Sequence, residues 1–326
     1  MKFDLAKLGK GRIGVIGDFC LDVYWHADMT KSELSRETPH FPLPVVRERM
    51  GPGGAGNVAM NLLALEPKSV HAVGVFGDDW RGAALKRLLE KAGADVSGVL
   101  VDPSRVTNAY IKPLRQGYGG SAVYEDPRLD FTNYEPLGAA TEKRLLALLD
   151  EVAGKADVLC VCDQMPFGCV TEAVRDRLCE MGRAGLRVFV DSRDRIGLYS
   201  GVTVKPNEIE AARLFKGAVK ASDMESLALA LEIRADRPAI MTAGERGCYV
   251  SENGRVTHVP AFPVAGETDI CGAGDTFLSC LACASAAGFP LVDAARLACA
   301  AASVTIRKLR TTGTASRAEL LARIGR

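Results

Sequence analysis

The 326-residue sequence lacks the features of a membrane or nucleic-acid-binding protein. No segment approaches 18 consecutive apolar residues, the length that a membrane-spanning helix needs. The N-terminus, MKFDLAKLGKGR, has scattered charges and no apolar core, unlike a secretory signal. A net charge of +1, from 41 basic and 40 acidic side chains, provides no overall field for nucleic acid or an anionic membrane. These absences predict a cytoplasmic protein with neither nucleic acid nor membrane as a partner.

Motifs for structural metals and two common nucleotide folds are also missing. Cys280 and Cys283 form a C-x-x-C pair, but no second pair or histidine cluster accompanies it at zinc-like spacing. The ten cysteines therefore favour reduced, buried thiols. No G-x-x-x-x-G-K-[ST] loop occurs, and the glycines at Gly14 and Gly17 do not match a dinucleotide-binding motif.

Alternating strand-like and helical segments indicate an α/β fold. Strands are expected at 12–17, 157–162, 186–190, 202–204 and 239–242, and helices follow most of them. Such repeated units predict a parallel sheet with helices on both faces. Ligands of these sheets bind beyond the carboxyl ends of the strands. The dipeptide Asn253-Gly254 predicts a hairpin between two further strands.

Two polar insertions, at about 19–49 and 106–133, interrupt this pattern. The second alternates apolar and polar residues around glycines, which is typical of antiparallel strands with one solvated face. We expect one domain over residues 1–326 in which both insertions form a small β lid.

The strongest chemical signal is the segment Asp269-Ile-Cys-Gly-Ala-Gly-Asp275. Gly272, Ala273 and Gly274 precede an apolar helix, whose first amides have no partner within the helix. Together with the helix dipole, these amides form a natural site for phosphate oxygens. Asp275, in the first turn, is either a reactive carboxylate or a residue that stabilises the helix N-terminus.

The segment resembles the C-terminal signature of the ribokinase-like, or phosphofructokinase-B, carbohydrate kinases, usually D-T-x-G-A-G-D. Ile270 stands where threonine is usual. The resemblance implies a three-layer sandwich with a mostly parallel central sheet and a β lid, and ATP-dependent phosphoryl transfer to a hydroxyl. It implies that Asp275 takes the proton of this hydroxyl. The amides of Gly272, Ala273 and Gly274 would hold the transferring phosphate.

The resemblance also implies an acceptor site. The segment Gly53-Gly54-Ala-Gly-Asn57 is similar to the family's N-terminal signature, whose glycine amides and asparagine bind sugar hydroxyls. Asp22 matches the first-strand aspartate that binds sugar hydroxyls, although Cys20 stands where asparagine is frequent. Asp163 follows a strand at a place where the family supplies another sugar contact. Taken singly, Gly53 and Gly54 are better explained by an ordinary turn and Asp22 by a surface carboxylate. Together, in this order and spacing, those explanations are improbable.

Two segments resemble the family's nucleotide side. Asn207 and Glu210 match N-x-x-E, in which the glutamate is associated with Mg²⁺ partly through water, and the same spacing fits a capping box. The loop T-x-G-x-x-G, which meets ATP phosphates, is matched by Thr242, Gly244 and Gly247. The family also implies a monovalent cation such as K⁺, framed by Asp269–Cys271 and Gly313–Ser316.

Within the family, the stretch from Gly17 to Trp25 and the tail Gly313–Ser316 resemble the heptose-phosphate kinases of ADP-heptose synthesis. The segment Ser35–Pro39 departs from that branch. A sugar or sugar phosphate is therefore the expected acceptor, with heptose 7-phosphate as the candidate. A nucleoside or other alcohol acceptor, or a non-catalytic sensor of sugar and nucleotide, stays open.

Three further expectations concern partners and charge. No nucleotidylyltransferase segment follows the kinase segment, so a stand-alone kinase is expected. Dimers of this family pair through the lid, which implies a homodimer here. Basic side chains of the insertions, if they are not merely solvated, would meet a phosphate carried by the acceptor; they are Arg36, Lys112 and Arg115.

Overall fold

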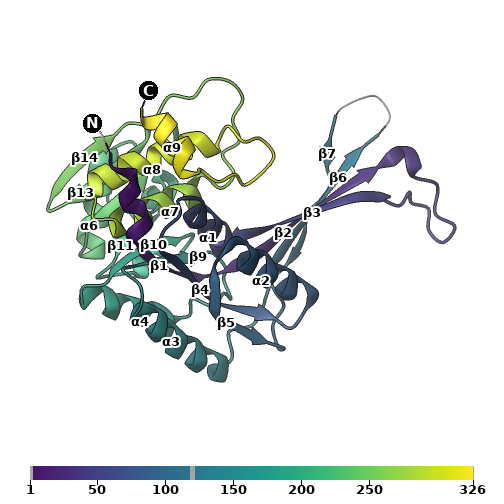
Figure 1. Cartoon of the computed structure of the whole chain (residues 1–326), viewed down its shortest axis with the longest axis horizontal. Helices are drawn as coiled ribbons and strands as arrows, with labels where there is room; N and C mark the ends of the chain where they lie inside the picture. Colours follow the sequence, from purple (N-terminus) through teal and green to yellow (C-terminus); the bar gives the residue numbers. More distant parts are fainter. Residues whose placement is uncertain (1–2, 118–121, 326) are drawn as a thin grey trace.

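Two sheets of unequal size organise the chain (Figure 1). The computed structural model describes residues 3–117 and 122–325. Residues 118–121, inside the second expected lid insertion, lie outside the described residues. Within the described part of the chain, no helix is both long and apolar enough to cross a membrane.

The larger sheet has nine strands, and most of its neighbouring strands are parallel. Only the last two pairings, β12 with β13 and β13 with β14, are antiparallel. The predicted mostly parallel sheet and the hairpin at Asn253-Gly254 are thus confirmed. In spatial order the strands are β14 (Arg255–Val259), β13 (Cys248–Glu252), β12 (Ala239–Thr242), β11 (Thr203–Val204), β10 (Arg187–Ser192), β9 (Val158–Asp163), β1 (Arg12–Gly17), β4 (Ser69–Gly77) and β5 (Asp95–Asp102).

Helices cover both faces of this sheet and complete the expected three-layer sandwich (Figure 1). Each face buries its own hydrophobic cluster. One face carries α1 (Ala55–Ala64), α2 (Trp80–Ala92), α7 (Ala273–Ala286) and α8 (Leu291–Thr305), with α9 (Arg317–Ile324) packed on α8. The other face carries α3 (Ala139–Ala153), α4 (Glu172–Arg183), α5 (Glu208–Leu214) and α6 (Met224–Ala235). Short 3₁₀ turns occur at η1 (Leu5–Lys10), η2 (Met29–Lys31), η3 (Ile196–Leu198) and η4 (Gly244–Arg246).

Local sequence explains why these elements form. Strand β9 reads VLCVCD and is buried along its whole length, as expected for a central parallel strand covered on both faces. Helix α2 begins at the Asp79 cap, whose carboxylate accepts a hydrogen bond from the Gly82 amide, and ends at left-handed Gly93. The small residues of α7 leave room for close packing against α1 and α8, and Cys280 and Cys283 are buried there as predicted.

The smaller sheet contains residues of both polar insertions and extends away from the main body (Figure 1). Its order is β3 (Val45–Gly54), β2 (Phe19–Asp28), β6 (Ala109–Gln116) and β7 (Tyr124–Glu125), with β8 (Leu129–Phe131) also paired to β6. The antiparallel pairing expected within the second insertion is confirmed, because β6 pairs antiparallel with both β7 and β8. Between the two insertions, however, β2 and β6 pair in parallel. Strand β6 therefore runs in the direction of β2 and opposite to β3, and between β3 and β6 the chain passes through α1, β4, α2 and β5 of the main body.

Candidate active site

Polar side chains gather at the carboxyl edge of the main sheet, where β1, β9, β10, β11 and β12 end. The parallel register aligns Gly17 with Cys162 and Cys162 with Asp191. Lys205 directly follows β11, and Thr242 ends β12. The structure therefore brings together segments from the whole chain at the edge where such sheets bind ligands.

Helix α7 begins at this edge. Its N-cap, Gly272, is left-handed with φ 78°, and no side chain caps the helix. The amide of Ala273 donates to the carbonyl of Ile270 at 3.1 Å, so a phosphate oxygen would share this donor with the turn. Gly274 lies beside a cation, because a Cβ built on it would be 4.0 Å from Lys205 Nζ. The helix start thus combines backbone donors, the positive end of a dipole and an ammonium group.

Asp275 is held by a chain of side-chain hydrogen bonds between α1 and α7. Its Oδ2 accepts a bond from Asn57 Nδ2 at 2.7 Å. Asn61 Nδ2 donates to Asn57 Oδ1 at 3.2 Å, and Thr276 Oγ1 donates to Asn61 Oδ1 at 2.9 Å. Asn57 and Asn61 are both only 2% exposed. Because Asn61 occupies the Asn57 amide oxygen, the Asn57 amide nitrogen is directed at the Asp275 carboxylate.

The surroundings raise the pKa of Asp275 to about 6. Burial is the main cause, and the charge of Asp191 adds to it. The hydrogen bond from Asn57 and the charge of Lys205 act in the opposite direction. At neutral pH this carboxylate is ionised and yet basic enough to accept a proton from a bound hydroxyl.

The expected acceptor residues lie together on the side of the lid sheet. Asp22 on β2 is 8% exposed, and burial raises its pKa against the opposing charges of Lys112, Arg128 and Arg49. A Cβ on Gly53 would lie 2.7 Å from Asp22 Oδ2, so only glycine leaves room for this carboxylate. Gly54 has φ 55° and packs against the backbone of Asp18. These residues lead directly into Asn57 on the first turns of α1.

The expected nucleotide residues also come together. An isolated β-bridge joins Asn207 to Thr242, and the Thr242 amide donates to Pro206 O at 3.0 Å. Asn207 and Glu210 form the predicted capping box at the start of α5, with Glu210 Oε2 accepting the Asn207 amide at 2.9 Å. Gly244 and Gly247 both have positive φ, 56° and 91°, in the tight turn around η4.

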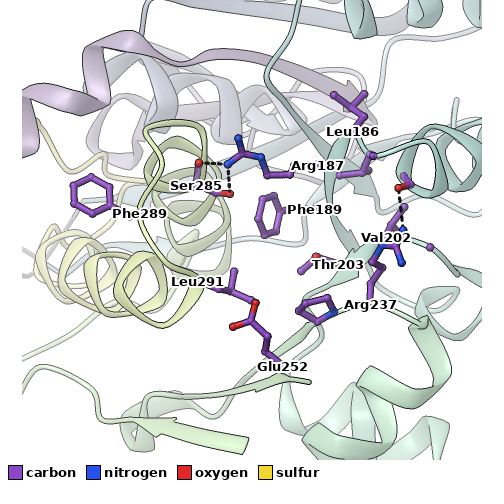
Figure 2. Close-up of a pocket in the computed structure, with 15 residues that line it drawn as sticks. Leu186, Arg187, Phe189, Val202, Thr203, Arg237, Glu252, Ser285, Phe289 and Leu291 are labelled. Atoms are coloured by element: carbon purple, nitrogen blue, oxygen red, sulfur yellow. Dashed lines mark hydrogen bonds between the residues drawn. The ribbon is translucent and has the colours of Figure 1, made fainter. Parts of the chain in front are cut away.

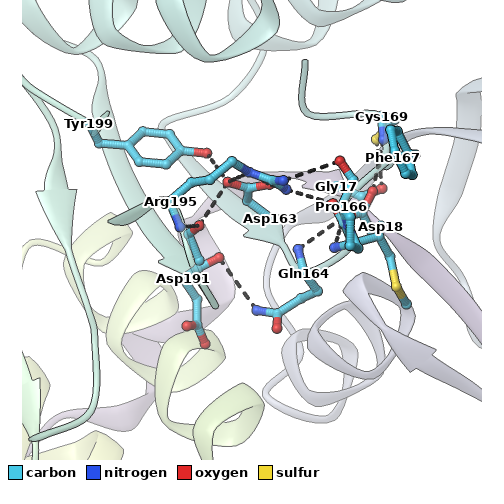
Figure 3. A network of polar contacts seen from close by, with 12 residues as sticks. Gly17, Asp18, Asp163, Gln164, Pro166, Phe167, Cys169, Asp191, Arg195 and Tyr199 are labelled. Carbon is cyan, nitrogen blue, oxygen red and sulfur yellow. Dashed lines mark hydrogen bonds and ion pairs between the residues drawn. The ribbon is translucent and has the colours of Figure 1, made fainter. Parts of the chain in front are cut away.

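Asp163 is the exception among the expected acceptor residues. Its side chain is fully buried and forms an ion pair with Arg195. Its Oδ2 also accepts hydrogen bonds from Ser192 Oγ at 2.8 Å and from the Tyr199 hydroxyl at 2.9 Å. Figure 3 shows Asp163 at the centre of this group. The Asp163 carboxylate is thus occupied by Arg195, Ser192 and Tyr199, whereas the acceptor site proposed below uses Asp22 and Asn57.

The three basic residues considered for a substrate phosphate differ in their surroundings. Arg36 is exposed, and Arg115 forms an ion pair with Asp126 at 2.6 Å. Lys112 is partly buried next to Tyr24, with its Nζ 3.5 Å from the Tyr24 hydroxyl. Arg49 lies over the ring of the same tyrosine at 4.2 Å. Of the three, Lys112 therefore faces the acceptor residues, as do Arg128 and Arg49, whose charges also act on Asp22.

Sequence reasoning missed two residues of this site. Lys205 is 3% exposed and forms an ion pair with Asp191 at 3.1 Å. Burial alone would lower its pKa, but the negative charges of Asp191, Glu210 and Asp275 outweigh burial and raise it. The sequence signal for Lys205 was its position directly after a short apolar strand, at the edge where ligands bind. For Asn61 the signal was a second asparagine four residues after Asn57 on an apolar helix.

A separate cavity of about 320 Å³ lies near the other end of the main sheet (Figure 2). Arg187 and Phe189 of β10, Arg237, and Phe289 near the end of α7 line it. Arg187 donates to Ser285 near the C-terminus of α7. None of the expected site residues lines this cavity.

Solved structures with the same fold include a ribokinase and a phosphofructokinase. Ribokinase from Arabidopsis thaliana, solved with ribose and ATP, is 18% identical with a TM-score of 0.70 over 97% of this chain and 99% of that one. Phosphofructokinase-2 from Escherichia coli, solved with substrates and products, is 19% identical with a TM-score of 0.74 over 97% and 100%. These likenesses confirm the predicted ribokinase-like fold.

Sequence comparison identifies the family. The protein named bifunctional protein HldE from Bradyrhizobium sp. (strain ORS 278) is 33% identical over 318 residues, or 95% of this chain. The chain spans 62% of the length of that relative. Residues 20–317 match the model of the pfkB family of carbohydrate kinases. The glycine-rich motifs predicted this family. The chain therefore belongs to the pfkB family of carbohydrate kinases.

Proposed function

We propose that this chain transfers the γ-phosphate of ATP to a hydroxyl of a sugar phosphate, with heptose 7-phosphate as the candidate acceptor. The observation that carries the proposal is the hydrogen bond from Asn57 to Asp275, which lies in the first turn of α7. It joins the acceptor residues to a carboxylate whose pKa is raised to about 6, next to a site for phosphate.

The proposed reaction uses Asp275 as the base. Because Oδ2 accepts the bond from Asn57, we assign Oδ1 as the oxygen that takes the proton of the acceptor hydroxyl. The hydroxyl oxygen forms a bond to the γ-phosphorus as the bond from this phosphorus to the ADP oxygen breaks. Lys205 and the amides at the start of α7 stabilise the negative charge of the transferring group.

Magnesium bound with ATP would neutralise the phosphate charges during transfer. We propose Glu210 as the carboxylate that holds it through water, because Mg²⁺ retains several waters and needs few protein ligands. Burial raises the pKa of Glu210, with the Asn207 amide acting against this shift and the charge of Asp191 adding to it. A nearby cation would stabilise its ionised form.

We propose that the segment around Asp269 binds K⁺. The Asp269 carboxylate already accepts hydrogen bonds from the amides of Cys271 and Arg310.

The cations of the lid support an acceptor that carries its own phosphate. Arg49 and Lys112 lie on the Tyr24 ring, and both act on the charge of Asp22. Arg49 is also anchored to the C-terminal segment, through Thr311 Oγ1 at 3.1 Å and Arg310 O at 3.0 Å. Asp22 would bind sugar hydroxyls while the two cations bind the phosphate.

We also propose a homodimer through the lid sheet. Its strands and the loop before β3 expose large apolar side chains, among them Phe41 at 61%, Val46 at 57% and Tyr124 at 65%. Such side chains on a sheet that projects from the body favour burial against a second copy. Val46→Lys should convert a dimer into a monomer in sedimentation, and a monomeric wild type at micromolar concentration would contradict the dimer.

The function is tested by ADP release with ATP, Mg²⁺ and either heptose 7-phosphate or the same heptose without phosphate. We expect strong stimulation by the phosphorylated sugar and much weaker stimulation by the free sugar. Lys112→Met should reduce the preference for the phosphorylated over the free heptose by about tenfold or more, because it removes one hydrogen bond to a charged group. Stimulation only by a nucleoside, or none by any alcohol while ATP still binds, would overturn the proposal.

The cytoplasmic location stays a prediction, which the use of ATP as donor supports.

A further inference from the structure

The carboxylate of Asp18 is buried at the end of β1 and holds a single loop. Asp18 is 2% exposed. Its Oδ2 accepts the amides of Gln164 at 2.9 Å and Met165 at 2.7 Å, and its Oδ1 accepts the amide of Cys169 at 2.9 Å. Figure 3 shows the residues of this loop around Asp18. We call the segment 164–169, which connects β9 to α4, the clamped loop.

Two arginines hold the clamped loop by its carbonyl oxygens. Arg195 donates to Met165 O at 2.6 Å and to Pro166 O at 3.3 Å. Arg105 donates to the carbonyl of Phe167. The loop amides thus donate to a carboxylate, and the loop carbonyls accept from guanidinium groups. Both kinds of contact are strong, charge-assisted hydrogen bonds.

Glycine is required where the loop passes closest to Asp18. A Cβ on Gly168 would overlap both carboxylate oxygens of Asp18. A side chain at this position would push the loop away and break the bonds to its amides. The absence of a side chain at Gly168 therefore allows the loop to approach the Asp18 carboxylate.

The clamped loop contacts both halves of the proposed site. On the lid side, the Tyr110 hydroxyl lies 3.6 Å from Met165 Sδ, and Tyr110 on β6 is the register partner of Asp22 on β2. On the sheet side, Gln164 Nε2 lies 3.5 Å from the carbonyl oxygen of Asp191. Arg105 lies just before β6, so its bond to the loop ties the entry of that lid strand to the main sheet.

Asp18 also fixes the acceptor motif through its own backbone. Its carbonyl oxygen accepts the amide of Ala55 at 3.0 Å, directly after Gly54. One residue therefore contacts the glycine turn that leads to Asn57 and, through its side chain, the loop that supports Tyr110. The side chain and the backbone act on different parts of the acceptor site, and only the side-chain contacts depend on the carboxylate.

We infer that Asp18 is a positioning residue that sets acceptor affinity by holding the clamped loop against lid strand β6. It touches neither substrate nor reacting atoms, and it acts through Met165, Arg105 and Tyr110. The kinetic part of its test rests on the proposed function, but the structural part does not.

The structural part is amide hydrogen exchange in full-length Asp18→Asn and Gly168→Ala. We expect exchange at least tenfold faster in residues 164–169 and in the segment 106–116, and unchanged exchange in 239–247 on the nucleotide side. Asp194→Asn, in an exposed ion pair with Arg213, and Gly138→Ala, with nothing within 4 Å of the added Cβ, are the matched controls and should behave as wild type. Faster exchange confined to 164–169, with 106–116 unchanged, would overturn the coupling to the lid.

The kinetic part compares the two Michaelis constants in the same variants. We expect the KM for heptose 7-phosphate to rise at least fivefold while the KM for ATP stays within twofold of wild type. A purely structural role would lower the thermal midpoint and leave this ratio unchanged, which would overturn the inference. If Asp18→Asn does not fold, Gly168→Ala decides the question. A wild type that is inactive with every acceptor would refute the proposed function, and the exchange experiment would still test the loop.

Discussion

Asn57 Nδ2 and Asp275 Oδ2 lie 2.7 Å apart and join two glycine-rich motifs separated by 218 residues. The contact sits where α1 and α7 pack together on one face of the sheet. A neutral amide donating to this partly buried carboxylate favours the ionised form of the group. The proposed acceptor motif thereby lowers the pKa of the proposed base, against the burial that raises it.

Loss of this hydrogen bond is expected to move the pH dependence of the reaction. In the wild type, kcat/KM should fall tenfold per pH unit below about pH 6, because protonated Asp275 cannot act as a base. In Asn57→Ala this midpoint should rise by about one pH unit, since one pKa unit corresponds to the ~1.4 kcal/mol of a hydrogen bond to a charged group. Rate measurements between pH 5 and 9 test this. An unshifted midpoint in Asn57→Ala would refute it, and Asp194→Asn is the control.

The raised pKa of Asp275 also predicts a pH-dependent stability. In the unfolded chain Asp275 ionises near pH 3.8, and in the folded chain at about 6. The folded state therefore loses stability as pH rises from about 4 to 6, by at most ~3 kcal/mol for this group. Asp275→Asn should be more stable than wild type above pH 6, and the difference should vanish below pH 4. Urea unfolding at pH 4 and pH 8 measures it. A variant that is less stable at pH 8 would contradict the burial argument.

Gly272 offers a test of the helix start with an internal control. Gly272→Ala places a Cβ 2.8 Å from Asn57 Nδ2 at φ 78°. Gly288→Ala adds a Cβ at the similar φ of 84°, with nothing within 4 Å. Both variants should lose about 1 kcal/mol of stability for the left-handed backbone. Only Gly272→Ala should lose kcat, by about tenfold or more, because it displaces Asn57 from Asp275. Equal kcat in both variants would show that this contact does not matter for turnover.

The proposed metal-binding role of Glu210 can be tested separately from its capping of α5. Glu210→Gln keeps an oxygen that accepts the Asn207 amide, so the capping box survives while the charge is lost. The Mg²⁺ concentration for half-maximal rate should rise about tenfold, as for other residues that hold a metal through water. Glu319→Gln removes the same charge from the capping box of α9 and should leave Mg²⁺ dependence unchanged. Equal behaviour of the two variants would remove Glu210 from the metal site.

The sequence predicted the architecture well because its signals are local. Strand β9 is an unbroken apolar run, helix α2 has clear start and stop residues, and Asn253-Gly254 determines a hairpin. The parallel pairing of β2 with β6 was missed because no local pattern records which strands meet after a long crossover.

For the site, motifs located the groups but not their contacts. Asp163 follows a strand at the correct edge, yet its partner Arg195 lies 32 residues away in the sequence and could not be inferred. The roles of Lys205 and Asn61 likewise depend on Asp191 and Asn57, and those contacts form only in the fold. Asp18 was visible in the stretch after Gly17, but its partners belong to a loop 146 or more residues later.

The most direct test of the central claim is the turnover of Asp275→Asn with ATP, Mg²⁺ and the best acceptor. The substitution preserves shape and keeps an oxygen that accepts from Asn57, but it removes the base. We predict a kcat lower by about 10²- to 10⁴-fold, the usual contribution of a general base. The dissociation constant for ATP should stay within twofold of wild type. A near-normal kcat with unchanged ATP affinity would contradict the assignment of Asp275 as the base.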